Sequence, residues 1–300
     1  MRLLLTAGLA LGVVVSIRPA AQSAAPTRVA SLDGFAIPES ARFDAERDRY
    51  YVSNVNAHAT ASDDNGFISL VGPDGTLLER RFIAGGARGV TLHAPKGMAI
   101  VGGDLWVTDV TVLRSFDRAS GAPRATVDLG PHGAVFLNDV TAAPDGTLYV
   151  SDTSLVFPPT GNPTRGKTDR VYRVAPSGEV SIAIADARLE GPNGVFWDAR
   201  AGHLLIASIM GKHVFRWTAA GGLHVLASGP GGYDGVERLD DRTLLVSSQD
   251  LPGLMTLVDG TLAPLVPGVS DVADIGVDVK RRRVAIPRLD PGIVELWQLP

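Results

Sequence analysis

PNGVFWDARAGHLLI, residues 192–206, is the stretch of sequence that decides the fold. It opens with the polar residue Asn193, runs through apolar residues to a turn rich in Asp, Arg and Gly, and ends in a β-rich segment at Ile206. Two such runs joined by a glycine-containing turn are typical of a β-hairpin. The stretch therefore predicts two antiparallel strands, with Asn193 at the start of the first one.

The same pattern occurs six times along the chain, and each copy opens with a polar residue that we call its anchor. The anchors are Glu39, Lys96, Asn138, Asn193, Asp234 and Asp274. The offset from an anchor to the last residue of its hairpin is nearly constant, whereas the spacing between successive anchors varies. A second pair of strands follows each hairpin, and four strands in about 40–45 residues is the length of a propeller blade. We expect an all-β fold, a six-bladed β-propeller with four-stranded blades over residues 26–300. A β-sandwich of two domains is the alternative, and it gives no reason for six anchors at one offset.

The last of the six units is too short for four strands. After Ile286 only residues 292–300 remain for a further strand. The segment Thr27–Asp33 lies ahead of the first anchor and can supply the missing outer strand. We therefore expect the N-terminal strand to close the last blade, which removes two open sheet edges.

The start of the chain, residues 1–25, is typical of a signal peptide. Arg2 gives a positive start, residues 3–17 are apolar, and residues 20–25 offer small side chains for cleavage. The apolar run is shorter than the ~20 residues that span a bilayer, although an uncleaved membrane anchor is the alternative. We expect a periplasmic or secreted protein.

Composition excludes several kinds of site and partner. The chain of 300 residues has no cysteine, which excludes a disulfide scaffold, thiolate catalysis and a metal site built on sulfur. Its formal net charge is −4 and it has no basic run, which argues against nucleic acid and, beyond the export signal, against a membrane as partner. The sequence leaves the oligomeric state open.

The anchors predict a metal site. In a propeller the first strands of the blades line the central channel, so all six anchors converge around one opening. Oxygen atoms of carboxylates and amides are ligands of hard cations such as Ca²⁺, and the lack of histidine and cysteine among the anchors argues against zinc or copper. We expect Glu39, Asn138, Asn193 and Asp234 to bind calcium or another divalent cation. The alternative is that they only hydrate the channel or start strands, as Asn and Asp commonly do.

Lys96 is the exception among the anchors. Like charge near a bound cation is unfavourable, so we expect Lys96 to lie away from the ion. It either binds an anionic group of the substrate or pairs with Asp274 across the channel, and the pairing is preferred; Lys96 and Asp274 are both candidate substrate contacts.

Two long insertions are expected on the same face as the anchors. Residues 54–66 and 153–169 both join the second and third strands of their units, so they can form a wall or lid over the opening, where loops often carry specificity. His58 in the first insertion is a candidate substrate contact, with a solvated loop residue as the alternative.

The sequence around four anchors resembles the regucalcin/gluconolactonase family of six-bladed β-propellers. The matching pieces are Pro38-Glu39-Ser40, Leu137-Asn138-Asp139, Gly191-Pro192-Asn193-Gly194 and Tyr233-Asp234-Gly235. The resemblance implies that Glu39, Asn193 and Asp234 are divalent-metal ligands. It implies that Asn138 contacts substrate, and in related propellers the corresponding Asn also ligates calcium. Phe136 stands where gluconolactone hydrolases place an arginine, which argues against a sugar-acid lactone and makes Phe136 a candidate substrate contact.

These observations lead to two hypotheses of function. The first is an exported metal-dependent hydrolase of a lactone or related ester, because a bound cation polarises a carbonyl and lowers the pKa of water. Asp234 is then the expected proton acceptor, with Asp139 or Asp152 orienting it from behind. The second is a non-catalytic propeller that binds a ligand or a protein and uses calcium structurally, since the fold alone does not choose. A strictosidine-synthase-like or lyase activity is a third reading, but the sequence has no Glu that specifically favours it.

Overall fold

The structure is a computed structural model that describes residues 24–158, 163–166, 169–250 and 253–300. The expected signal peptide, residues 1–25, lies outside the described residues except for its last two. In the described part of the chain the regular structure consists of strands and two short 3-10 helices, Gly130–His132 and Ala187–Leu189. None of the helices described has the length and apolar character of a membrane span.

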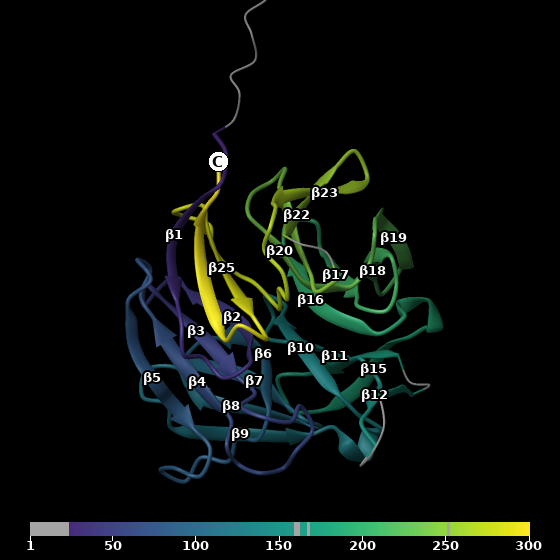
Figure 1. The fold of residues 1–300 in the computed structure, drawn as a ribbon. Helices are drawn as coiled ribbons and strands as arrows, with labels where there is room; N and C mark the ends of the chain where they lie inside the picture. The colour runs from purple at the N-terminus through teal and green to yellow at the C-terminus, as the bar shows by residue number, and fades with distance from the viewer. Residues whose placement is uncertain (1–23, 159–162, 167–168, 251–252) are drawn as a thin grey trace, which may run out of the picture.

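The strands form antiparallel meanders of four (Figure 1). The first sheet contains β2 (Pro38–Asp44), β3 (Arg49–Asn54), β4 (Phe67–Val71) and β5 (Leu77–Ala84). The second contains β6 (Pro95–Val101), β7 (Asp104–Asp109), β8 (Val112–Asp117) and β9 (Pro123–Asp128). The third contains β10 (Leu137–Ala142), β11 (Leu148–Asp152), β14 (Arg170–Val174) and β15 (Val180–Ala185), and a short hairpin, β12 (Leu155–Val156) and β13 (Thr164–Arg165), lies in its insertion.

An eight-stranded sheet follows, made of two such meanders. One contains β16 (Pro192–Asp198), β17 (His203–Ser208), β18 (His213–Thr218) and β19 (Gly222–Ser228). The other contains β20 (Tyr233–Arg238), β21 (Leu244–Ser248), β22 (Leu254–Val258) and β23 (Thr261–Val266). A single parallel residue pair, Ser228 with Thr261, joins them. The expectation of an all-β fold built from four-stranded units is confirmed.

The last sheet joins the two ends of the chain. It contains β24 (Gly276–Asp278), β25 (Arg283–Arg288), β26 (Ile293–Gln298) and β1 (Thr27–Leu32). Strand β1 pairs with β26 in antiparallel register, and Figure 1 shows this purple strand beside the yellow C-terminal strands. The predicted closure by the N-terminal strand is confirmed.

The first strands of the meanders contact one another in a closed series. The contacts run from β2 through β6, β10, β16, β20 and β24 and back to β2. Glycines permit the close approach, because a Cβ on Gly194 would lie 2.2 Å from the carbonyl oxygen of Asp234, and one on Gly235 would lie 2.4 Å from Asp274 Oδ1. The glycine that follows an anchor therefore lets the next strand pack against it.

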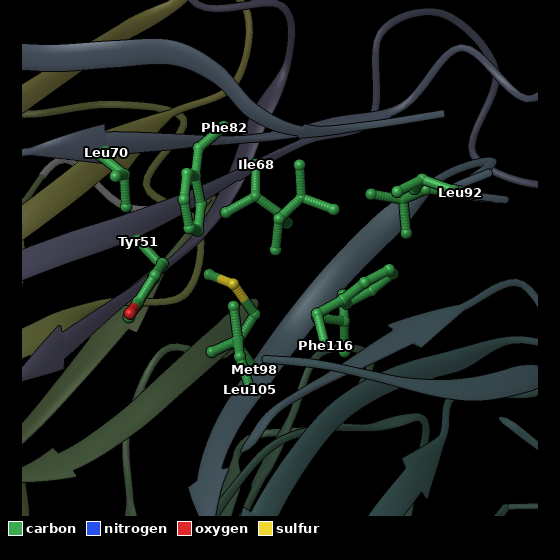
Figure 2. Packing of buried hydrophobic residues seen from close by; sticks show 11 residues of the cluster. Tyr51, Ile68, Leu70, Phe82, Leu92, Met98, Leu105 and Phe116 are labelled. Atoms are coloured by element: carbon green, nitrogen blue, oxygen red, sulfur yellow. The ribbon is translucent and has the colours of Figure 1, made fainter. Parts of the chain in front are cut away.

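Apolar side chains fill the space between neighbouring sheets. Figure 2 shows Tyr51, Ile68 and Phe82 of the first sheet against Met98 and Phe116 of the second. Burial of each such side chain is worth roughly 1.5–3 kcal/mol relative to exposure. A similar cluster between the first and last sheets completes the core, and it contains Tyr50, Val52, Val71, Ala285, Val294 and Leu296.

Candidate functional site

Five of the six anchors occupy the same structural position, the second residue of a first strand. The register with the second strand shifts across each of them, namely Glu39, Lys96, Asn138, Asn193 and Asp234. Such β-bulges leave a residue out of the ladder and re-aim its side chain. The sixth anchor, Asp274, lies ahead of β24 in an isolated bridge to Ser40.

A cavity of about 370 Å³ lies at these anchors. Its polar lining consists of Glu39, His58, Lys96, Asn138, Asn193 and Gln249. The rest of its larger side chains form what we call the apolar wall, which consists of Ile37, Val55, Phe136, Leu155, Phe157, Ile209 and Leu289. The volume lies within the range of about 300–1,000 Å³ that is usual for small-molecule sites.

Among the described residues, three buried anchor oxygens have no hydrogen-bond partner, and two of them belong to residues that line the cavity, Glu39 and Asn193. They are Glu39 Oε2, Asn193 Oδ1 and Asp234 Oδ1. A buried oxygen without a partner is costly, at about 1–3 kcal/mol and more for a charged group, so each one calls for an explanation. A cation bound between the three side chains would satisfy all of them at once.

Around the cavity, buried carboxylates outnumber the cations that act on them. Five buried carboxylates gather here, those of Glu39, Asp139, Asp234, Glu237 and Asp274. The cations that act on them are Lys96 and Arg42. Burial, and next the charge of Asp274, raise the pKa of Asp234 to about 8. Burial raises the pKa of Glu39 well above its ordinary value, and the charge of Asp234 raises it further. These raised pKa values reflect burial first and repulsion between the carboxylates second.

The donor set fits a hard cation only when the amides take part. Within residues 24–158, 163–166, 169–250 and 253–300, no group of three or more His, Asp or Glu side chains is arranged to hold a metal ion. Glu39, Asn138 and Asn193 share the cavity, and the amide of Asn193 acts on the carboxylate of Asp234, whose pKa it lowers. Two carboxylates and two amide oxygens are a ligand set that suits Ca²⁺.

The sequence analysis did not identify Thr153 and Gln249, which hydrogen-bond to two of the proposed metal ligands. Asn138 Nδ2 donates to Thr153 Oγ1 at 3.0 Å, and Thr153 Oγ1 in turn donates to the carbonyl of Pro192 at 2.9 Å. The Gln249 amide donates to Asp234 Oδ2. Thr153 and Gln249 each directly follow a second strand, β11 and β21, so they occupy equivalent positions. The repeat itself carries the signal, because both lie at the same offset from their anchors, Asn138 and Asp234.

Lys96 lies inside the cavity rather than away from the proposed ligands. Its Nζ donates to the carbonyls of Ala59 at 3.1 Å and Ala94 at 3.2 Å, and lies 4.4 Å from the centroid of the Phe136 ring. Burial lowers the pKa of Lys96, and the charge of Glu39 opposes that shift. Lys96 thus lines the cavity, where a contact to an anionic substrate group is open to it, and its separation from a bound ion stays a prediction.

The expected pairing of Lys96 with Asp274 is wrong. Asp274 Oδ2 accepts the hydroxyl proton of Ser40 at 2.6 Å and lies 4.0 Å from Arg42 Nη2. Arg42 reaches this carboxylate from β2 and also pairs with Glu237. Arg42 therefore supplies the positive charge beside Asp274. Asp274 is not among the described residues that line the cavity.

The two insertions form part of the cavity lining, as predicted. His58 from the first insertion meets the Phe157 ring of the second edge-on, with centroids 5.4 Å apart. Phe157 stacks on Phe136 at 5.4 Å. Lys96, Phe136, Phe157 and His58 thus form a continuous row along one side of the cavity.

Asp139 and Asp152 accept hydrogen bonds from backbone N–H groups and do not orient Asp234. Asp139 accepts the N–H groups of Val140 and Val195, each at 2.7 Å. Asp152 accepts the N–H of Phe136 at 3.0 Å, together with those of Val135 and Ser154. Within the described chain neither of them hydrogen-bonds to Asp234, so the expected contact is not formed. Their carboxylates instead fix the strands and the segment that carry Asn138 and Phe136.

The chain matches known proteins in structure but not in sequence. No family model matches it, and no curated protein does. A gluconolactonase from Xanthomonas campestris has a TM-score of 0.64 at 19% identity, covering 95% of this chain and 99% of that one. A luciferin-regenerating enzyme has a TM-score of 0.66 at 14% identity, covering 91% and 94%. The fold is that of the gluconolactonase propellers. This excludes the alternative of two β-sandwich domains.

The propeller fold does not by itself choose an activity. A virginiamycin B lyase from Staphylococcus aureus has a TM-score of 0.61 at 12% identity, covering 90% of this chain and 99% of its own. Because a gluconolactonase and a lyase share the architecture, the function of this propeller has to be argued from its site.

Proposed function

We propose that the protein is a metal-dependent hydrolase that opens a lactone or a related ester. Glu39, Asn138, Asn193 and Asp234 would hold calcium or another divalent cation at the cavity. The observation that carries the proposal is the set of three buried, unpartnered oxygens of Glu39, Asn193 and Asp234, which come from three separate strands. The fold shared with a gluconolactonase supports the reaction class.

We infer that the propeller has six blades and occupies residues 26–300. Two observations support this: the eight-stranded sheet consists of two complete meanders, and six first strands contact one another in a closed series. The sequence of residues 1–25 supports export to the periplasm or the exterior.

The side chains at the cavity suit ester hydrolysis. The chemistry that a divalent cation supplies in such a site is polarisation of the substrate carbonyl and a lowered pKa for water. Asp234, which accepts a hydrogen bond from the Gln249 amide, would accept the proton of the attacking water. Lys96, which lines the cavity, would stabilise negative charge that develops on a substrate oxygen. The apolar wall excludes bulk water and strengthens these interactions.

The test combines metal binding with turnover. Calcium binding is measured by titration calorimetry, and hydrolysis is measured on a panel of lactones and aryl esters with calcium and with a chelator. We expect Asp234→Asn to lose at least about a hundredfold in kcat and to weaken calcium binding. Glu79→Gln, a change on the exposed part of β5, should alter neither.

Thermal stability has to be followed in the same samples, because loss of a bound ion also destabilises the fold. Full activity in Asp234→Asn would overturn the proposal. Calcium binding without turnover on any substrate of the panel would favour a non-catalytic binding propeller instead.

A further inference from the structure

The apolar wall is built from equivalent positions of different sheets. Val55, Ile209 and Leu289 each directly follow a second strand, β3, β17 and β25. At the same position of other sheets stand Thr153 and Gln249, which hydrogen-bond to Asn138 and Asp234. One structural position is thus polar after the hairpins of Asn138 and Asp234 and apolar after those of Glu39, Asn193 and Asp274.

The aromatic part of the wall is held firmly in place. The N–H groups of Val135 and Phe136 both donate to Asp152, at 3.0 Å, which fixes the backbone under the Phe136 ring. Phe136 is 5% exposed, and Phe157 stacks on it with an angle of 29° between the ring planes. A ligand that enters the cavity therefore meets a preformed apolar surface.

One residue of the wall has an unfavourable backbone conformation. Ile37 has a φ of 54°, in the left-handed region that β-branched residues rarely adopt, and its side chain is 37% exposed. A glycine would remove that strain. Strained residues that line a cavity are a feature of functional sites, and here the residue adds apolar surface to the cavity.

The polar lining already has partners or a proposed role. Lys96 donates to two backbone carbonyls, and Gln249 donates to Asp234. Glu39, Asn138 and Asn193 are the proposed metal ligands. A substrate with many hydroxyl groups would lose water on binding and gain few hydrogen bonds in return, which is unfavourable.

We propose that the substrate is an apolar lactone or ester, with an aliphatic chain or an aromatic ring packed against Ile37, Phe136, Phe157, Ile209 and Leu289. The carbonyl lies at the polar lining and the chain lies along the apolar wall. The reaction rests on the proposed function, whereas the ligand class rests on the cavity alone.

The experiment uses a series of γ-lactones of increasing side-chain length, from γ-butyrolactone through γ-hexalactone and γ-octalactone to γ-decalactone. We expect kcat/KM to rise about fourfold for each added methylene, the equivalent of about 0.8 kcal/mol, until the cavity is filled. D-glucono-δ-lactone should be the poorest substrate. In Phe157→Ala, kcat/KM should depend less on side-chain length. Val156→Ala, a change at the neighbouring exposed residue, should leave this dependence unchanged.

A binding measurement separates the two proposals. The 2-alkylcyclopentanones keep a ring carbonyl but have no ester bond to cleave, and their affinity is measured by calorimetry. If no lactone is hydrolysed but affinity still rises with chain length, the proposed reaction falls and the ligand class stands. If lactones are hydrolysed with no dependence on chain length, or gluconolactone is the best substrate, the ligand class is overturned and the hydrolase stands.

Discussion

The ammonium group of Lys96 lies 4.4 Å from the centroid of the Phe136 ring, at the point where the polar lining of the cavity meets the apolar wall. Its charge also acts on Glu39, a proposed metal ligand. Lys96 is thus a built-in cation beside a site that we propose for a divalent cation. The two positive charges compete for the carboxylate of Glu39.

Removal of this ammonium group should strengthen calcium binding. In Lys96→Met the repulsion between Lys96 and the ion disappears, and we expect the Kd for calcium to fall about tenfold, the equivalent of about 1.4 kcal/mol. Calorimetric titration measures the change. Lys280→Met, in an exposed turn, is the matched control and should leave the Kd unchanged. Weaker binding in Lys96→Met would mean that Lys96 orients Glu39 instead of competing with the ion.

The stability of the metal-free protein should fall as the pH rises. Burial and the charge of Asp274 raise the pKa of Asp234 to about 8, whereas in the unfolded chain it is about 3.9. Between these values the folded protein keeps a proton that the unfolded chain has lost, so the free energy of unfolding decreases with pH over this window. Scanning calorimetry in chelator should show a lower Tm at pH about 8 than at pH about 5.

Calcium should reverse this dependence. Metal ligands have to be deprotonated, so the ion binds more tightly as the pH rises and stabilises the fold most at the alkaline end. In Asp234→Asn the contribution of Asp234 to the pH dependence of Tm should be absent. An equal Tm for the chelated wild type across the window would contradict the assigned pKa.

The close approach of the strands at Asn193 and Asp234 makes a further prediction. In Gly194→Ala the new Cβ would meet the backbone oxygen of Asp234 at 2.2 Å, so one strand has to move. We expect a loss of about 1–3 kcal/mol in urea denaturation and weaker calcium binding, because the two ligands shift apart. Gly103→Ala is the control, since its Cβ would lie 3.8 Å from the nearest atom, Arg124 Nη1. Similar losses in both variants would show that the strand contact is not specific to the site.

The sequence was sufficient to predict the repeat, the closure of the last sheet by the N-terminal strand, and the anchors at the cavity. PNGVFW and its five counterparts place an anchor in front of each hairpin, and five of the anchors lie in equivalent β-bulges. The pairing of β1 with β26 followed from the missing strand of the last unit. These features are predictable because they follow from local pattern and from the need to close sheet edges.

The charges inside the channel were missed because they depend on contacts between distant sheets. Arg42 and Glu237 both lie three residues after an anchor, and they form an ion pair although 195 residues separate them. Arg42 of that pair and Ser40 are the partners of Asp274, which leaves Lys96 to the cavity. The offset of three residues from the anchor is a signal that the repeat contains, but only the closed arrangement of strands shows which two positions meet.

The strain at Ile37 allows function and stability to be separated. In Ile37→Gly the left-handed backbone is no longer unfavourable, which offsets the loss of a partly exposed side chain and the greater freedom of the unfolded chain. We expect the free energy of unfolding to stay within about 1 kcal/mol of the wild type. Because the variant lacks part of the apolar wall, kcat/KM for γ-decalactone should fall several-fold while that for γ-butyrolactone stays the same.

Val110→Gly is the matched control for this prediction. Val110 is also β-branched, with a φ of 59°, and directly follows the second strand β7, but it is not among the described residues that line the cavity. It should show the same relief of strain in urea denaturation without any change in the lactone series. A loss of activity on both lactones in Ile37→Gly, or an equal loss in Val110→Gly, would show that the backbone conformation, rather than the apolar side chain, is what the site requires at Ile37.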